Sequence, residues 1–309
     1  MNMAMHKVPE YNIYIGTLFA LQGQKALADA GVTHVLSALM GKIELRLVSS
    51  FKHMHIQVED DDDEDMLQYF NQSNEFIAEA LSSGGTILVH CIAGISRSST
   101  LVIAYIMQDR RISLEEAWSL VQEGRPIACP NDSFKEQLAI YEQDEFAVSE
   151  SSPGYRRWKL KKQAELATAS GTAPLPKIYS EEKATGNSTV ELRCKRCRCP
   201  LAQSSAIIPH LPPSASSKYD ASYKSKIGKA MVSVLAPACM HYFLDPVRWM
   251  QPELEKGELD GKFDCPKCQT KIGSYRWQGM QCTCGAWVTP GISIQRGRAD
   301  EIRKFVAKA

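Results

Sequence analysis

One short segment carries residue types that together suit nucleophilic attack on a phosphate group. In ILVHCIAGISRSST, residues 87–100, five residues separate the His90-Cys91 pair from Arg97 and Ser98. A loop of this length can turn its backbone N–H groups inward around a phosphate. The planar Arg97 guanidinium can bind two phosphate oxygens, a geometry that lysine does not offer, and positive surroundings favour the thiolate form of Cys91. The spacing therefore predicts a cysteine nucleophile that bonds covalently to phosphorus.

The residues between the cysteine and the arginine are expected to hold the phosphate. Gly94 permits a positive φ or a close approach in this turn, and a helix that begins near Ser98 adds the favourable end of its dipole. The apolar strand 87–89 would deliver the cysteine to the carboxyl end of a sheet, where open α/β folds place ligands. A core cysteine beside an unrelated surface arginine would need the whole pattern to arise by chance. The expected phosphate-binding residues are Ile92, Ala93, Gly94, Ile95, Ser96 and Arg97.

A second set of cysteines, in the C-terminal half, has the spacing of metal ligands. The chain holds ten cysteines, and its opening residues, MNMAMHKVPE, mix charge and polarity where a secretory signal would be apolar. We therefore expect an intracellular protein without disulfides. Two C-x2-C pairs and one C-x-C pair predict two structural, tetrahedral zinc ions. Redox-active C-x2-C pairs are the alternative, but no thioredoxin-like strand and helix surround them. The expected ligands are Cys194, Cys197, His210, Cys239, Cys265, Cys268, Cys282 and Cys284, with Cys199 and His241 as spares and the pairing left open.

Strand-like and helix-like segments alternate through the first half of the chain. Ser113 and Glu116 form a capping box ahead of one helical run. The alternation predicts an α/β domain with a mixed central sheet flanked by helices, followed by a small β-rich zinc-binding domain. The expected strands are 12–15, 32–39, 51–58 and 86–90, and the expected helices are 67–81, 98–111, 114–123 and 132–145.

The charge of the chain changes sign between its two halves. Residues 1–150 hold 10 Lys and Arg against 22 Asp and Glu, a net charge of −12, and residues 151–309 hold 26 against 13, a net charge of +13. The basic half suits nucleic acid or an acidic surface, although such an excess is often only a solvated surface. The longest apolar stretches are too short to span a bilayer. We expect a catalytic domain over 1–148, a basic helix at 155–168 with a loose linker within 149–189, and a zinc-binding domain over 190–309 that a flexible loop at 212–230 interrupts.

The motif HC-x2-G-x-SRS stands intact at 90–98 and resembles that of the protein tyrosine phosphatase superfamily, specifically its dual-specificity branch. The resemblance implies the fold of that branch and an upstream aspartic acid that protonates the leaving oxygen. Asp60, two residues after Val58 and 31 before Cys91, fits this position best. The acidic residues at 61–65 would only charge a loop and a helix N-terminus.

The same resemblance suggests roles for four further residues. Ser98 would hydrogen-bond the sulfur and help break the thiophosphate, and His90 would orient the loop rather than transfer protons. Asn131 lies in RPIACPNDSFKEQL, which looks like the RP-x-PN-x-F-x-x-QL segment of the family and would support the loop from behind. Cys129 in this segment is expected to be a small core residue, or else a redox partner of Cys91. The chemistry needs no metal, and a shallow site would accept phosphoserine, phosphothreonine and phosphotyrosine in proteins.

The C-terminal cysteines lie in segments that are also distinctive. FDCPKCQTKIGSYRWQGMQCTCGAWVTPGISI, with CMHYFLDPVRWM before it, looks like the zinc-binding tail of the one dual-specificity subgroup that carries such a tail. In that subgroup the tail is linked to late assembly of the large ribosomal subunit, in nucleus and cytoplasm, without a need for phosphatase activity. The resemblance therefore implies a pre-60S particle or its ribosomal RNA as a partner, with which the basic half is compatible, and no membrane partner.

Two other functions stay open at this point. The chain could act mainly as a non-catalytic ribosome-assembly factor, or as a phosphatase of RNA 5′-triphosphate, phosphoinositide or glycogen phosphate. The intact set of Cys91, Arg97 and Asp60 favours retained catalysis, and a triphosphatase would not need Asp60 in the acid role. The loop residues Ile92 and Ile95 add no basic charge that would favour polyanionic substrates.

Overall fold

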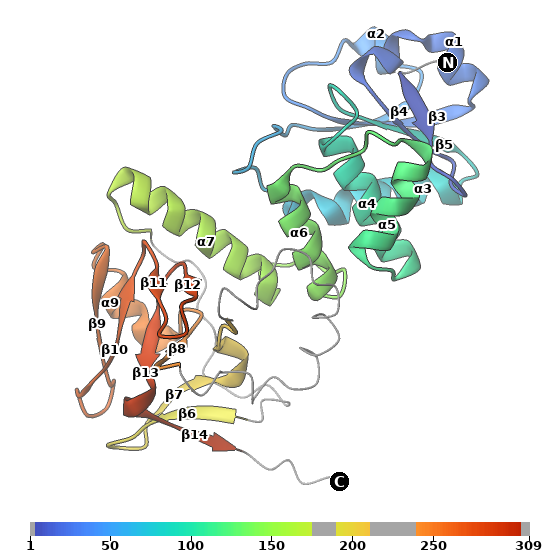
Figure 1. The fold of residues 1–309 in the computed structure, drawn as a ribbon. Helices are drawn as coiled ribbons and strands as arrows, with labels where there is room; N and C mark the ends of the chain where they lie inside the picture. The colour runs from blue at the N-terminus through green and yellow to red at the C-terminus, as the bar shows by residue number, and fades with distance from the viewer. Residues whose placement is uncertain (1–3, 175–189, 211–238, 304–309) are drawn as a thin grey trace. The chain divides into compact units, whose positions relative to one another are not determined.

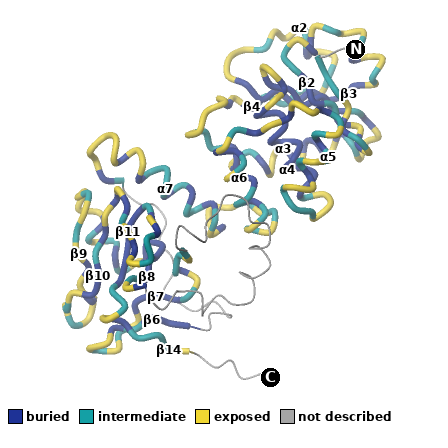
Figure 2. Tube along the Cα trace, in the orientation of Figure 1, coloured by how far each residue is buried: buried dark blue, intermediate teal, exposed yellow. Residues whose placement is uncertain are grey.

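The computed structural model describes residues 4–174, 190–210 and 239–303, and the predicted loop at 212–230 and the last part of the predicted linker lie outside these ranges. The chain divides into two compact units, residues 1–158 and 159–309. The first unit thus extends past the predicted end of the catalytic domain at residue 148. Figure 2 shows that each unit has its own buried interior.

The first unit is built on a mixed five-stranded sheet of order β1-β2-β5-β3-β4. β2, β5, β3 and β4 run parallel to one another, and β1 pairs with β2 in the antiparallel direction at the edge. The central strand β5 carries Leu88 on one face and Ile87 and Val89 on the other, and all three are buried. The strands are β1 (Met5–Lys7), β2 (Ile13–Gly16), β3 (Val32–Ala38), β4 (Lys52–Ile56) and β5 (Thr86–His90).

Helices cover both faces of this sheet (Figure 1). The larger core lies under α3 to α6 and includes Ile87, Val89 and the apolar middle of α4, and the smaller one lies under α1 and α2 and includes Leu88 and Val35. Two-sided burial explains why β5 reads as a continuous apolar run. The helices are α1 (Gln24–Asp29), α2 (Leu45–Val48), α3 (Phe70–Ser82), α4 (Arg97–Arg110), α5 (Leu114–Gly124) and α6 (Asp132–Gln143).

These elements confirm the predicted fold class. Each of the four expected strands and four expected helices of this unit is present, with ends shifted by a few residues, and the Ser113–Glu116 capping box forms at the start of α5. The expected helix at 67–81 begins as a 3-10 turn at Leu67–Tyr69 before α3. β1, α1 and α2 were not predicted, because elements of three to six residues are too short to show a period.

The predicted basic helix is α7 (Pro153–Ser170), longer at both ends than expected. Its first turns belong to the first unit, where Tyr155 and Trp158 are buried in the core. The Tyr155 hydroxyl donates a hydrogen bond to Asp65 Oδ2 at 2.7 Å. The residues that follow belong to the second unit, whose core includes Leu160 and Ala164.

The second unit consists of short antiparallel strands in three small sheets, of orders β8-β13-β10-β9, β11-β12 and β14-β6-β7. Its core centres on Trp277, Tyr275 and Phe263. Within the described residues no helix is long and apolar enough to cross a membrane. The elements are β6 (Val190–Cys194), β7 (Pro200–Gln203), β8 (His241–Phe243), α9 (Gln251–Leu254), β9 (Asp260–Asp264), β10 (Lys271–Arg276), β11 (Met280–Gln281), β12 (Trp287–Val288), β13 (Ser293–Gln295) and β14 (Ala299–Arg303).

Candidate active site and metal centres

The predicted nucleophile lies at the carboxyl end of β5, at the start of the loop that leads into α4. Cys91 is 1% exposed. Its Sγ accepts a hydrogen bond from the Gly94 N–H at 3.1 Å and from the Ser98 hydroxyl at 3.3 Å. Two hydrogen-bond donors therefore point at the sulfur, and the loop that supplies them leads into a helix of 14 residues. The structure thus brings Ser98 to the place that the sequence resemblance implied.

Gly94 makes the turn of this loop possible. Its φ is +67°, and a Cβ at this position would lie 2.5 Å from the carbonyl oxygen of Gly16 in β2. The loop is therefore packed directly against the backbone of the neighbouring strand. A side chain here would meet both a strained φ and a backbone clash.

Arg125, which sequence reasoning did not single out, holds the loop from outside. It is 1% exposed, its Nε donates to Gly94 O at 2.6 Å, and its Nη2 donates to Ala93 O at 3.1 Å. Because the C=O and N–H of a trans peptide point in opposite directions, these bonds turn the next N–H groups toward the interior of the loop. The pKa of Arg125 is lowered, because the effect of burial is larger than the opposing effect of the nearby Cys91. The only signal in the sequence was its position at the start of the RP-x-PN-like segment.

His90 is fully buried behind the nucleophile. Its Nε2 lies 2.6 Å from Ser37 Oγ and its Nδ1 lies 3.2 Å from Cys91 O. Burial lowers the pKa of His90 to about 4, with smaller contributions in the same direction from His53 and His55. The imidazole is therefore neutral near pH 7, with the proton on Nδ1 and Ser37 donating to Nε2. Such a group orients the backbone and is poorly suited to proton transfer, in line with the predicted role.

Arg97 and Asp60 meet at the mouth of the loop. Arg97 is 6% exposed, its Nη1 donates to Val58 O at 3.2 Å, and its Nε lies 3.6 Å from Asp60 Oδ2. This contact is an ion pair longer than a hydrogen bond, and the buried Nε has no hydrogen-bond partner within the described residues. A phosphate oxygen could supply the missing acceptor. The structure thus brings the predicted general acid to the predicted phosphate ligand.

The other acidic residues of this loop have structural contacts. Asp61 Oδ1 accepts from the Asp63 N–H, and Asp65 accepts from the Gln68 N–H and the Tyr155 hydroxyl. These bonds shape the loop and the start of the following helix.

Asn131 connects the acid to the phosphate loop. Its Nδ2 donates to Asp60 Oδ1 at 3.0 Å, its backbone N–H donates to Ser96 Oγ at 3.1 Å, and its Oδ1 caps α6 by accepting from the Phe134 N–H at 2.8 Å. Support of the loop was predicted, but the bond to Asp60 was not. Such a bond depends on how two distant segments pack, which the sequence does not show.

The expectation that Cys129 is a core residue is wrong. Its thiol is exposed, while its backbone N–H donates to Ile95 O at 2.9 Å. The segment lies along the surface, with Ile127 53% exposed. Backbone bonds hold it against the loop, so the side chain of Cys129 is free to face outward.

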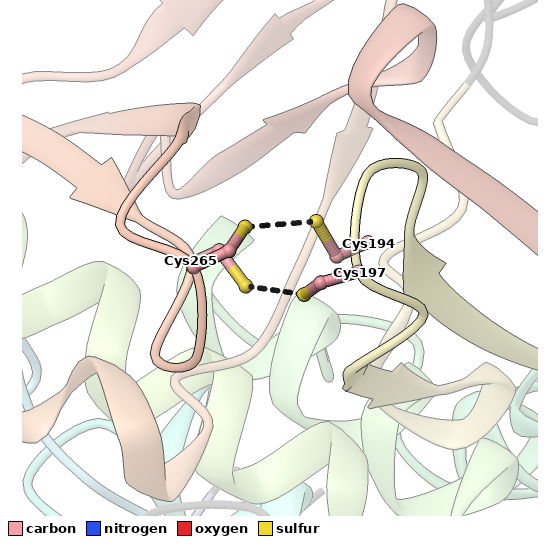
Figure 3. A group of neighbouring side chains, drawn as sticks. Cys194, Cys197 and Cys265 are labelled. Carbon is pink, nitrogen blue, oxygen red and sulfur yellow. Dashed lines mark hydrogen bonds between the residues drawn. The ribbon is translucent and has the colours of Figure 1, made fainter.

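The eight predicted metal ligands gather in two groups of four, each with its ligand atoms within 4.8 Å of one another. The first group joins the two C-x2-C pairs (Figure 3). Cys194 ends β6 and Cys197 lies in the turn after it, and Cys265 and Cys268 follow β9. The Sγ–Sγ distance is 3.8 Å for Cys194 and Cys268 and 3.5 Å for Cys197 and Cys265. A tetrahedral zinc with Zn–S bonds of about 2.3 Å requires sulfur separations of about 3.8 Å, so the residues fit the ion.

The two C-x2-C pairs share one local fold. In each, the backbone N–H of the residue after the second cysteine donates to the carbonyl of the first, Arg198 to Cys194 and Gln269 to Cys265. Both of these residues have a positive φ, 63° and 55°. Non-glycine residues pay for this conformation, and here it lets two sulfurs of one turn face the same point.

The second group consists of His210, Cys239, Cys282 and Cys284. His210 Nε2 lies 3.5 Å from Cys239 Sγ, and the β11–β12 hairpin carries the other two thiols. Burial, and then the nearby Cys282 and Cys284, raise the pKa of Cys239 to about 12. Thiolates this close together repel one another, and a dication would remove that cost. Cys199 and His241, the predicted spares, belong to neither group.

Comparisons with known proteins agree with this fold. A family model described as the dual specificity phosphatase catalytic domain matches residues 13–144. Tyrosine-protein phosphatase yvh1 of Schizosaccharomyces pombe is 41% identical over 294 residues, which cover 95% of this chain and 84% of that protein. Tyrosine-protein phosphatase YVH1 of Saccharomyces cerevisiae is 34% identical over 329 residues, which cover 94% of this chain and 89% of that protein. Dual specificity protein phosphatase 12 of Rattus norvegicus is 31% identical over 302 residues, which cover 96% of this chain and 88% of that protein.

The fold and these matches define a protein phosphatase with a cysteine-containing catalytic domain. The chain belongs to the dual-specificity phosphatase family. Because the relatives match nearly the whole chain and not residues 13–144 alone, it belongs to the subgroup with a further C-terminal domain.

Proposed function

We propose that the enzyme hydrolyses phosphotyrosine, phosphoserine and phosphothreonine in proteins through a cysteinyl-phosphate intermediate. In the first step Cys91 Sγ attacks phosphorus, the bond from phosphorus to the leaving oxygen breaks, and Asp60 donates its proton to that oxygen. In the second step Asp60 accepts a proton from water as the water oxygen attacks phosphorus. The S–P bond then breaks, and the Ser98 hydroxyl stabilises the departing thiolate.

The pairing of Asp60 with Arg97 is the observation that supports this cycle most directly. The Asp60 carboxylate lies 3.6 Å from the Arg97 Nε. A substrate phosphate would take over the guanidinium, because a phosphate offers it a bidentate partner. The acid would then lie beside the phosphate that Arg97 holds, close to where the leaving oxygen must depart.

Two variants test the assignment on phosphopeptides. Cys91→Ser is expected to abolish turnover while it still binds the phosphopeptide. Asp60→Asn is expected to lower kcat by about 100-fold or more, the usual contribution of a general acid. The loss should be smaller for p-nitrophenyl phosphate, whose leaving group needs little protonation. An Asp60→Asn enzyme with unchanged kcat on phosphopeptides would instead favour a phosphatase that does not need the acid, such as an RNA 5′-triphosphatase.

The second part of the proposal concerns the C-terminal unit. The four thiols of one group, and the three thiols and the imidazole of the other, would each hold one zinc ion, which cross-links the loops that supply them. We further propose that this unit binds pre-60S ribosomal particles in the nucleus and cytoplasm. The resemblance of the tail to its subgroup and the net charge of +13 over residues 151–309 support this role.

Sedimentation of tagged wild-type and Cys91→Ser protein from cell lysate tests the ribosomal role. If both migrate with large-subunit precursors, the C-terminal unit docks without catalysis. If both stay at the top of the gradient, the ribosomal role is wrong, and phosphoproteins trapped by Cys91→Ser become the lead to function.

A further inference from the structure

A cavity of about 240 Å³ lies in the second unit, beside the first cysteine group. Lys195 and Arg196, in the turn after β6, and Arg298, just before β14, line it together with Thr270 and Ile272. All three basic side chains belong to exposed residues. No acidic residue lines the cavity, so it is a positively charged hollow.

The basic residues around this cavity divide into paired and unpaired ones. Lys195, Arg196 and Arg298 make no ion pair within the described parts of the chain, and all three line the cavity. The basic residues that alternate with them along the same two segments are neutralised. These paired residues are Arg193 with Glu191, Arg198 with Asp300, and Arg296 with Glu301. Along residues 193–198 and 296–298, the unpaired positive charge is therefore concentrated at the cavity.

Hydrogen bonds fix the guanidinium of Arg196 and the backbone of Lys195 and Arg298. The Arg196 Nη1 donates to Thr270 Oγ1 at 2.8 Å, which fixes the guanidinium and leaves its other N–H donors available. The Lys195 N–H donates to Arg298 O at 3.0 Å and joins the two segments. Antiparallel pairing of β14 with β6 and the bonds of the cysteine turn fix both segments further. Because its backbone and the Arg196 guanidinium are already fixed, the site loses less entropy on binding an anion than a mobile loop would.

The shape and lining of the cavity indicate the class of ligand. At about 240 Å³ the cavity is large enough for a phosphate group and smaller than a typical small-molecule pocket of roughly 300 to 1,000 Å³. No aromatic side chain lines it, whereas proteins that read unpaired bases stack them on aromatic rings. Contacts to a phosphate backbone fit, and base readout does not.

We infer that Lys195, Arg196 and Arg298 form a binding site for backbone phosphates of structured RNA. This inference rests on the proposed ribosomal role and adds to it the atoms that make the contact. Recognition through backbone phosphates is insensitive to base sequence and strongly dependent on salt.

The site is tested with the full-length, zinc-loaded protein and a fluorescein-labelled RNA duplex of mixed sequence, by anisotropy between about 50 and 200 mM salt. Arg196→Ala is expected to weaken binding and to lower the slope of log Kd against log salt by about one, and the triple Ala variant at 195, 196 and 298 by about three. Arg198→Ala is the matched control: it removes the same charge two residues away, from an arginine that Asp300 already neutralises. Zinc content and melting temperature show that each variant is folded.

Wild-type affinity and slope for Arg196→Ala and the triple variant would overturn the inference. So would equal losses for Arg196→Ala and Arg198→Ala, since only the overall charge would then matter. Displacement of the RNA by polyglutamate at equal charge concentration would identify an acidic protein segment as the ligand instead. If the wild type binds no RNA yet sediments with pre-60S particles, the phosphate site is wrong and the ribosomal role stands. If RNA binding depends on Arg196 while the protein stays at the top of the gradient, the reverse holds.

Discussion

Asn131 is the residue through which the acid loop, the phosphate loop and α6 meet. Its side chain donates to Asp60 through Nδ2 and caps α6 through Oδ1, so two roles depend on one amide. We expect Asn131→Asp to separate them. The carboxylate still caps the helix, but it cannot donate to Asp60 and repels it. We predict a fall in kcat of about 10- to 100-fold, part of the contribution of a general acid, with KM and melting temperature nearly unchanged.

Asn131→Ala is the companion variant. It loses the cap as well, so unfolding should become easier by about 1 kcal/mol, and kcat should fall with it. Steady-state kinetics on a phosphotyrosine peptide and thermal unfolding together distinguish the two effects. If Asn131→Asp turns over like the wild type, the bond to Asp60 has no part in positioning the acid.

His90 makes the stability of the first unit depend on pH. Burial lowers its pKa from 6.5 to about 4, so the unfolded chain binds more protons between these values. Stability therefore falls as the pH drops from 6.5 to 4, by about 3 kcal/mol from this group. His90→Gln does not titrate. We expect its free energy of unfolding, measured with urea, to be lower at pH 7 but to fall less toward pH 4. Parallel curves for the two proteins would contradict the neutral, buried assignment.

Single residues differ in how far the sequence reveals them. Cys91, Arg97 and Ser98 lie within nine residues of one another and of a strand end, so their chemistry is legible from spacing alone. Arg125 contacts Gly94, which lies 31 positions earlier in the chain, and Asn131 contacts Asp60, which lies 71 positions earlier. Such contacts come from tertiary packing, and no local pattern encodes them.

At the scale of elements, the loop between β5 and α4 depends on its contact with β2. Gly94→Ala would place a Cβ 2.5 Å from Gly16 O at a φ of +67°. Strain in φ alone costs about 1 to 2 kcal/mol, and the clash should displace the loop. We predict a lower melting temperature and loss of tungstate binding, a phosphate mimic, measured by calorimetry.

Gly41→Ala is the matched control for that prediction. Its φ is +93°, but nothing lies within 4 Å of a Cβ there, so it carries strain without a clash. We expect it to be destabilised similarly by the backbone term while it keeps full tungstate affinity. Equal loss of tungstate binding in both variants would mean that the close approach of the loop to β2 is unimportant.

The elements that sequence analysis missed share a physical cause. β1 pairs only at the sheet edge and α2 has four residues, so neither shows a period that a pattern could reveal. The segment before residue 159 was predicted to be a basic helix and linker outside any core, because it is polar and basic. Its two aromatic residues, Tyr155 and Trp158, nevertheless lie in the first core. The sequence shows that this segment carries aromatic residues, but it does not show which core they pack into.

At the scale of the whole molecule, the two units have separate cores and separate chemistry. Among the residues that the structure describes, the apolar core that supports Cys91 ends at Trp158, and both cysteine groups lie within the second unit. The spacing of the cysteines predicted eight ligands, but only the fold shows that the two C-x2-C turns combine into one group. The catalytic site should therefore be insensitive to what happens at the metal sites.

Metal content and substitution of single cysteines test this separation. We expect two zinc ions per chain by elemental analysis, one after Cys268→Ser or Cys282→Ser, and two after Cys199→Ser, since Cys199 belongs to neither group. Because structural zinc supplies much of the folding free energy of small domains, a strong chelator should unfold the second unit, seen as exposure of the fully buried Trp277. Turnover of p-nitrophenyl phosphate by Cys268→Ser should stay near that of the wild type. A parallel loss of turnover and zinc would mean that the two units depend on one another for folding.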